Sequence, residues 1–169
     1  MRRWNILLIG CILMWMGVIF FLSNRSASYS REDSYNVALI IGEFFVPNFD
    51  ELTEAQQKDF AIKIQYPLRK TAHFVEYLIL GALLSGAFWE QKNRLKSLAL
   101  ALGGGILFAI SDEIHQTLIP GRVGHFHDIL IDSAGTLTGI LLFLFCLYLK
   151  RKIKGLCHFP PHLQADKKR

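Results

Sequence analysis

The chain opens with an apolar stretch, residues 4–22, that contains no charged side chain. A helix rises about 1.5 Å per residue, so a stretch of this length crosses a hydrocarbon core of about 30 Å. Three more apolar stretches follow, at roughly 67–89, 98–119 and 127–149. We therefore predict an all-α, polytopic membrane protein, a four-transmembrane-helix bundle that forms a single domain over residues 1–169.

The composition supports a membrane protein and excludes other classes. Of the 169 residues, 51% are hydrophobic and 20% are charged, and the mean hydropathy is +0.29. A chain of this length with four spans has no room for a separate catalytic domain, so any chemistry must come from the spans and their loops. The three cysteines form no C-x-x-C pair, which argues against a disulfide or a structural zinc site.

Basic residues are distributed unevenly between the two sides of the predicted spans. Residues 1–3, the turn at 90–97 and the tail at 150–169 hold twelve Lys or Arg against two acids, whereas residues 23–70 hold six against seven. Because cytoplasmic segments are enriched in Lys and Arg, we expect both termini in the cytoplasm. This asymmetry accounts for the net charge of +5 without nucleic acid as a partner. A cleaved leader followed by three spans is an alternative that leaves the orientation of those spans unchanged.

The segment between the first two spans, residues 23–66, is predicted to be an external loop with short helices. It is Ser-rich at first and then holds a mostly apolar stretch that Pro47 closes. Thr53 and Gln56 have the spacing of a capping box, which predicts a helix start. We expect that helix to end where Pro67 opens the next one, and its apolar positions favour a place on the membrane surface.

The charged and histidine side chains of the last three spans all fall in the half that faces outside in this topology. A charge within the bilayer costs a few kcal/mol, so these groups should face a protein or water-filled interior. Helical spacing places the polar residues of each span on one stripe. The expected ligand-binding site comprises Lys70, His73, Tyr77, Asp112, Glu113, Gln116, Arg122, Asp128 and Asp132.

Small residues are placed where they can bring these stripes together. Gly135 and Gly139 form a G-x-x-x-G motif, Gly81 precedes Ser85 by one turn, and residues 103–105 are three consecutive glycines. Small residues let membrane helices approach closely, so we expect tight helix packing at all three places.

Arg122 lies in a tight external loop and is the only Lys or Arg between the third and fourth spans. Its guanidinium is suited either to tie Asp112, Glu113 or Asp128, or to bind the phosphate or carboxylate of a lipid or peptidoglycan ligand. Snorkelling to the membrane interface is a third interpretation.

Catalytic candidates exist, but no catalytic motif surrounds them. His73 is a candidate proton carrier, and Asp112, Glu113 and Asp128 are candidate acids or bases, although a buried histidine satisfied by a carboxylate is equally consistent. There is no G-x-S-x-G elbow, no phosphate loop of Walker form and no H-E-x-x-H pair. We therefore expect no cofactor and no metal, with a divalent metal on the His and carboxylate set as an alternative.

Three motifs in the last three spans carry a family resemblance. They are Lys70-x-x-His73-x-x-x-Tyr77, then Ser111-Asp112-Glu113-x-x-Gln116-x-x-x-Pro120-Gly121-Arg122, then Asp128-x-x-x-Asp132-x-x-Gly135-x-x-x-Gly139. Taken together, the motifs resemble the VanZ-like membrane proteins, a family named for an accessory factor in resistance to teicoplanin. The resemblance implies a multi-pass protein of the bacterial cell membrane with an envelope and glycopeptide-resistance role. Where Asp132 stands, the family pattern more often has Asn, so this carboxylate is either protonated or compensated by Arg122, Lys70 or a metal.

Four functions are consistent with this pattern. The first is a membrane factor that binds an amphiphile, either a lipid-linked cell-wall precursor or a lipoglycopeptide, with membrane lipids as further partners. The second is an enzyme that modifies a lipid-linked substrate at the outer leaflet. A small transporter is less favoured, because the inner halves of the spans lack polar groups. A purely structural polar cluster is the fourth.

Overall fold

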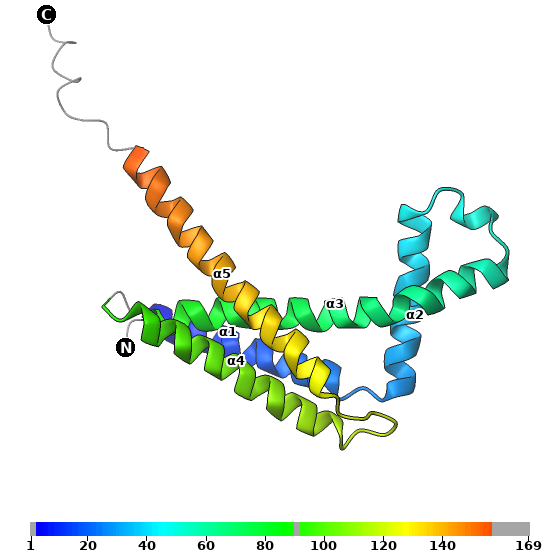
Figure 1. The fold of residues 1–169 in the computed structure, drawn as a ribbon, viewed down its shortest axis with the longest axis horizontal. Coiled ribbons are helices and arrows are strands. Elements are labelled where there is room, and N and C mark those ends of the chain that lie inside the picture. Colours follow the sequence, from blue (N-terminus) through cyan, green and yellow to red (C-terminus); the bar gives the residue numbers. More distant parts are fainter. Residues whose placement is uncertain (1–2, 90–91, 157–169) are drawn as a thin grey trace, which may run out of the picture.

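The computed structural model describes residues 3–89 and 92–156, and within them all regular structure is helical (Figure 1). The elements are α1 (Arg3–Ser23), α2 (Ala27–Phe45), the short 3-10 helix η1 (Phe49–Glu51), α3 (Glu54–Phe88), α4 (Arg94–Gln116) and α5 (Phe126–Leu156). The predicted all-α class is confirmed.

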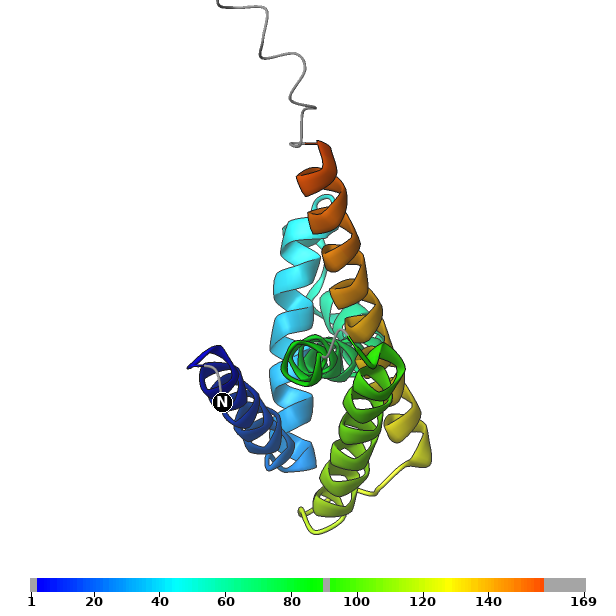
Figure 2. The same ribbon diagram turned by 90° about the vertical axis from the view of Figure 1, so that its left-hand side faces the viewer.

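Four of these helices, α1, α3, α4 and α5, are long and apolar enough to cross a membrane, which confirms the predicted number of spans. In Figure 1, α1, α3 and α4 run alongside one another and α5 crosses them obliquely. Figure 2 looks toward one end of α3 and shows α1 on one side of it and α4 on the other. The start of α1, the turn between α3 and α4 and the end of α5 lie toward one end of the molecule. The loops at 24–26 and 117–125 lie toward the other end, beside α2.

The segment between the first two spans differs from the expected short helices. It contains α2, a helix of 19 residues that stands across one end of the long helices and packs on α3. Gly42 makes the turn after α2 compact, because the ring of Phe49 packs where a side chain at that position would be. Phe49 also meets the edge of Phe60 at 5.2 Å between ring centroids. Through these two contacts, Phe49 of η1 links α2 to the first part of α3.

Helix α3 begins as predicted but does not end where predicted. Thr53 accepts from the backbone N–H of Gln56, and the Gln56 side chain accepts from the backbone N–H of Thr53, which is the expected capping box. The expected break at Pro67 is wrong, because α3 runs through Pro67 as a single helix of 35 residues. A helical proline removes one backbone hydrogen bond, here to the carbonyl of Lys63. Lys63 is exposed, so water can replace the missing donor.

Glycines set the packing of α5 against its neighbours. A side chain at Gly81, Gly135 or Gly139 would overlap backbone atoms of the facing helix in the α3–α5 pair. Gly105 of α4 is similarly close to the side chain of Thr136. Gly103, by contrast, has no neighbouring atom within 4 Å, so only the last glycine of the 103–105 run serves helix contact as expected.

Candidate functional site

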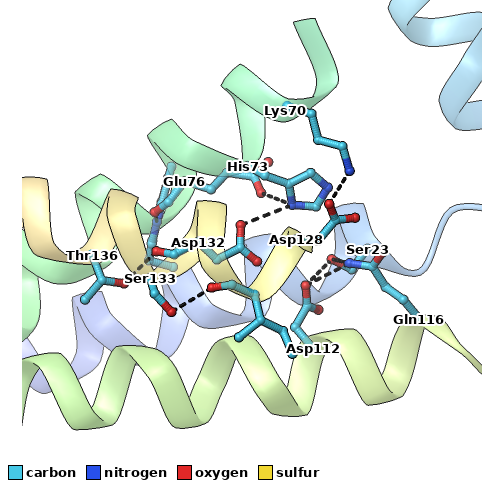
Figure 3. Close-up of polar contacts among 12 residues, drawn as sticks. Ser23, Lys70, His73, Glu76, Asp112, Gln116, Asp128, Asp132, Ser133 and Thr136 are labelled. Atoms are coloured by element: carbon cyan, nitrogen blue, oxygen red, sulfur yellow. Dashed lines mark hydrogen bonds and ion pairs between the residues drawn. The ribbon is translucent and has the colours of Figure 1, made fainter. Parts of the chain in front are cut away.

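The polar residues of α3, α4 and α5 converge near the end of the bundle where α2 lies (Figure 3). Asp112 is fully buried and joins α4 to the end of α1. The Ser23 hydroxyl donates to Asp112 Oδ2 at 2.8 Å, and Gln116 Nε2 donates to the same oxygen at 3.0 Å. Ser23 was not predicted as a partner of Asp112, although it is a polar residue directly at the end of an apolar span.

Two further contacts hold α5 and its preceding loop in place. Lys70 of α3 forms an ion pair with Asp128 in the first turn of α5 (Figure 3). Glu113 of α4 accepts a hydrogen bond from the backbone N–H of His125. These carboxylates therefore connect elements that are distant in sequence, and their first role in the structure is to fix the loop between α4 and α5.

His73 lies between two carboxylates. Its Nδ1 atom is 3.7 Å from Glu76 Oε2 and 4.0 Å from Asp132 Oδ1, which are ion-pair rather than hydrogen-bond distances (Figure 3). Nδ1 of His73, Oδ1 of Asp112, Oδ1 of Asp132 and the Tyr77 hydroxyl are all buried without a hydrogen-bond partner in the described residues. Such groups are costly to bury, which makes the interior beside His73 a candidate place for proton or ligand chemistry.

Two neighbouring pockets open around His73. The first, which we call the apolar pocket, has a volume of about 290 Å³ and a mostly apolar wall that includes Leu22, Val37, Leu68 and Ala72. The second, which we call the polar pocket, has a volume of about 190 Å³ and lies between α2, α3 and the loop before α5. The residues that line both pockets are Ser30, Arg69, His73 and Arg122. The two pockets are therefore adjacent, with these four side chains between an apolar and a polar part.

The structure divides the expected site residues into two groups. The first group lines the polar pocket and consists of Lys70, His73, Gln116, Arg122 and Asp128. The second group lines neither pocket and consists of Tyr77, Asp112, Glu113 and Asp132. Arg31 and Arg69 are among the pocket residues that were missed as site residues. Arg69 lies in the first turn of the predicted second span. Nothing in the sequence indicates that Arg31 of α2 reaches the same pocket.

Arg122 is half-buried and forms no salt bridge within the described part of the chain. Burial lowers the pKa of its guanidinium, and the nearby Asp112 carboxylate opposes that shift. The expected tie to Asp112, Glu113 or Asp128 is therefore not formed. The guanidinium is left facing the two pockets.

The two span serines that directly neighbour an aspartate, Ser111 and Ser133, are not paired with that aspartate. Ser111 donates to the carbonyl of Phe108 at 2.8 Å, and Ser133 donates to that of Ile129 at 2.6 Å, so both hydroxyls bond their own helix. Over residues 3–89 and 92–156, no group of three or more His, Cys, Asp or Glu side chains is arranged to hold a metal ion.

Comparison with known proteins identifies one family. The model of the family described as VanZ/LLP1 matches residues 8–148, which is most of the chain and covers all or most of each of the four spans. No curated protein and no solved structure matches the chain.

Proposed function

The chain belongs to the VanZ/LLP1 family, and from that premise we propose that it binds an amphiphilic or lipid-linked ligand at the outer face of the bacterial cell membrane. By doing so it contributes to resistance against glycopeptide and lipoglycopeptide antibiotics such as teicoplanin. The ligand is a lipid-linked cell-wall precursor or the lipoglycopeptide itself.

The adjacency of the two pockets is the observation that carries this proposal. Arg69, His73 and Arg122 line both of them, so a single molecule can place a polar head in the polar pocket and an apolar chain in the apolar pocket. Ligand sites are typically concave and mostly apolar, with a few convergent polar groups that fix orientation. An amphiphile matches both parts at once, whereas a small polar solute would leave the apolar pocket unused.

The charge distribution supports an outward position for these pockets. Lys92, Arg94 and Lys96 lie at the turn between α3 and α4, and further basic residues, 150–152, lie near the end of α5. Both groups lie toward the end of the molecule opposite the pockets (Figure 1). Because Lys and Arg accumulate on the cytoplasmic side, this arrangement supports cytoplasmic termini and a site facing outward.

A membrane enzyme acting on a lipid-linked substrate is a second candidate, and the surroundings of His73 favour it. The imidazole lines both pockets and lies within 4.0 Å of two carboxylates, Glu76 and Asp132. A histidine oriented by carboxylates is suited to act as a general base, and Arg122 could stabilise developing negative charge.

The resistance phenotype tests the proposal. We expect the Arg122→Gln and Ala72→Trp variants to lose most of the protection against teicoplanin that the parent chain gives a susceptible host, because one lacks the head-group cation and the other fills the apolar pocket. Arg94→Gln is the matched control, since Arg94 is exposed and lies at the other end of α4. All variants are compared at equal membrane abundance. Unchanged protection by both pocket variants would contradict the proposal.

Mass spectrometry of the host's lipid-linked precursors then separates the two candidates. A binding protein leaves the covalent structure of these lipids unchanged, whereas an enzyme produces a new species that disappears in a His73→Gln variant.

A further inference from the structure

The polar pocket carries an unbalanced positive charge. Its charged lining residues are Arg31, Arg69, Lys70, Arg122 and Asp128, and Lys70 and Asp128 are paired with each other. The three arginines form no salt bridge within the described residues. The pocket therefore presents three guanidinium groups that form no ion pair within the described residues. The carboxylates of Asp112, Glu113 and Asp128 act on Arg122 from beyond ion-pair distance.

These arginines come from three separate elements. Arg31 belongs to α2, Arg69 to α3, and Arg122 to the loop before α5. Tertiary packing brings like charges to one pocket, which is unfavourable unless an anion offsets the repulsion. Arg69 is also close enough to contribute to the lowered pKa of Arg122, although burial is the larger cause. The arrangement is typical of a site that is completed by a negatively charged ligand.

The number and type of these cations indicate the chemistry of the anion. A guanidinium presents parallel N–H donors that match the oxygens of a carboxylate or a phosphate. A single carboxylate has two oxygens and one charge, so one arginine satisfies it. A terminal phosphate has three free oxygens and close to two charges at neutral pH, which suits several guanidinium groups from different directions. The polar pocket, at about 190 Å³, is several times the volume of a water molecule and has room for such a group.

We infer that the ligand is a lipid phosphate. Its terminal phosphate or diphosphate is bound by Arg31, Arg69 and Arg122, and its hydrocarbon chain lies in the apolar pocket against Val37 and Leu68. This inference rests on the proposed amphiphile-binding function and adds the identity of the head group. It also gives a function to Arg31 and to helix α2, which forms one wall of both pockets.

Binding of a matched set of lipids tests the inference. The full chain is placed in phosphatidylcholine nanodiscs, and native mass spectrometry measures the binding of phosphatidic acid and of diacylglycerol with the same acyl chains. The two lipids differ only in the phosphate. We expect phosphatidic acid to bind at least tenfold more tightly. The Arg31→Gln, Arg69→Gln and Arg122→Gln variants should each weaken its binding about tenfold or more, because each removes charge-assisted hydrogen bonds.

Controls separate the possible failures. Arg94→Gln should leave the preference for phosphatidic acid over diacylglycerol intact. If Arg94→Gln weakens the binding of phosphatidic acid as much as the pocket variants do, the attraction is non-specific and the inference is overturned. Inorganic phosphate should compete poorly; if it competes as well as the lipid does, the apolar pocket has no part in binding and the inference is overturned. Equal binding of both lipids overturns the phosphate assignment while the amphiphile-binding function stands. If neither of the two lipids nor a lipoglycopeptide binds, both the inference and the proposed amphiphile-binding function are overturned.

Discussion

At the scale of single residues, Lys70 and Asp128 connect α3 to α5, with side chains 20% and 13% exposed. Lys70→Met should lower the free energy of unfolding by about 3 kcal/mol, because it leaves the Asp128 carboxylate largely buried without its partner. The double variant Lys70→Met/Asp128→Leu should recover most of that loss, since an apolar pair of similar size avoids the desolvation cost. Unfolding of the single and double variants in the same detergent measures the coupling. Equal destabilisation by the single and double changes would contradict this role.

The sequence predicted which polar residues share a helix face, but not how they pair. Helical spacing is enough to place Lys70 and His73 on one stripe of α3 and to direct them inward. It does not determine that Lys70 pairs with Asp128, or that Asp112 bonds with Ser23 rather than Arg122. Those choices depend on the depth and rotation of each helix, which are set by packing.

At the scale of helices, the close approach of α3 and α5 depends on glycine. In Gly139→Ala the new methyl group would overlap the carbonyl of Leu78 and come within 2.8 Å of the backbone nitrogen of Ala82. Backbone atoms in a helix cannot move aside independently, so we expect a loss of about 3 kcal/mol in the free energy of unfolding. Gly103→Ala is the matched control and should be neutral or slightly stabilising, because that position is open. Equal thermal stability of the two variants in detergent would argue against this packing.

The start of α3 was predicted correctly, but the break expected at Pro67 was not. The capping box at Thr53 depends on residues three apart, so the sequence alone is sufficient to identify it. Whether a helix continues through Pro67 depends on the tertiary contacts that stabilise the turns on either side of it. Here α3 packs on α2, and Ala61 in its first part is fully buried; this packing is not visible in the local sequence.

At the scale of the whole molecule, four apolar stretches and one polar end were predictable because the membrane imposes strong rules on span length and charge. The position of α2 was not predictable from the sequence. This helix is held across the end of the bundle by tertiary contacts, and it brings Arg31 to the polar pocket and Val37 to the apolar pocket. The combined site therefore depends on long-range packing that no local pattern encodes.

The central claim is that the two pockets hold one amphiphile, and site-specific photo-cross-linking in bacterial membranes tests it most directly. A photoreactive residue replaces Val37 in the apolar pocket or, as a control, Leu142 on α5, two positions that are 44% and 46% exposed. We predict that the Val37 probe captures one predominant amphiphile and loses it in an Arg122→Gln background, whereas the Leu142 probe captures membrane lipids in bulk proportion. Capture of the same bulk mixture at both positions, unaffected by Arg122→Gln, would contradict the claim.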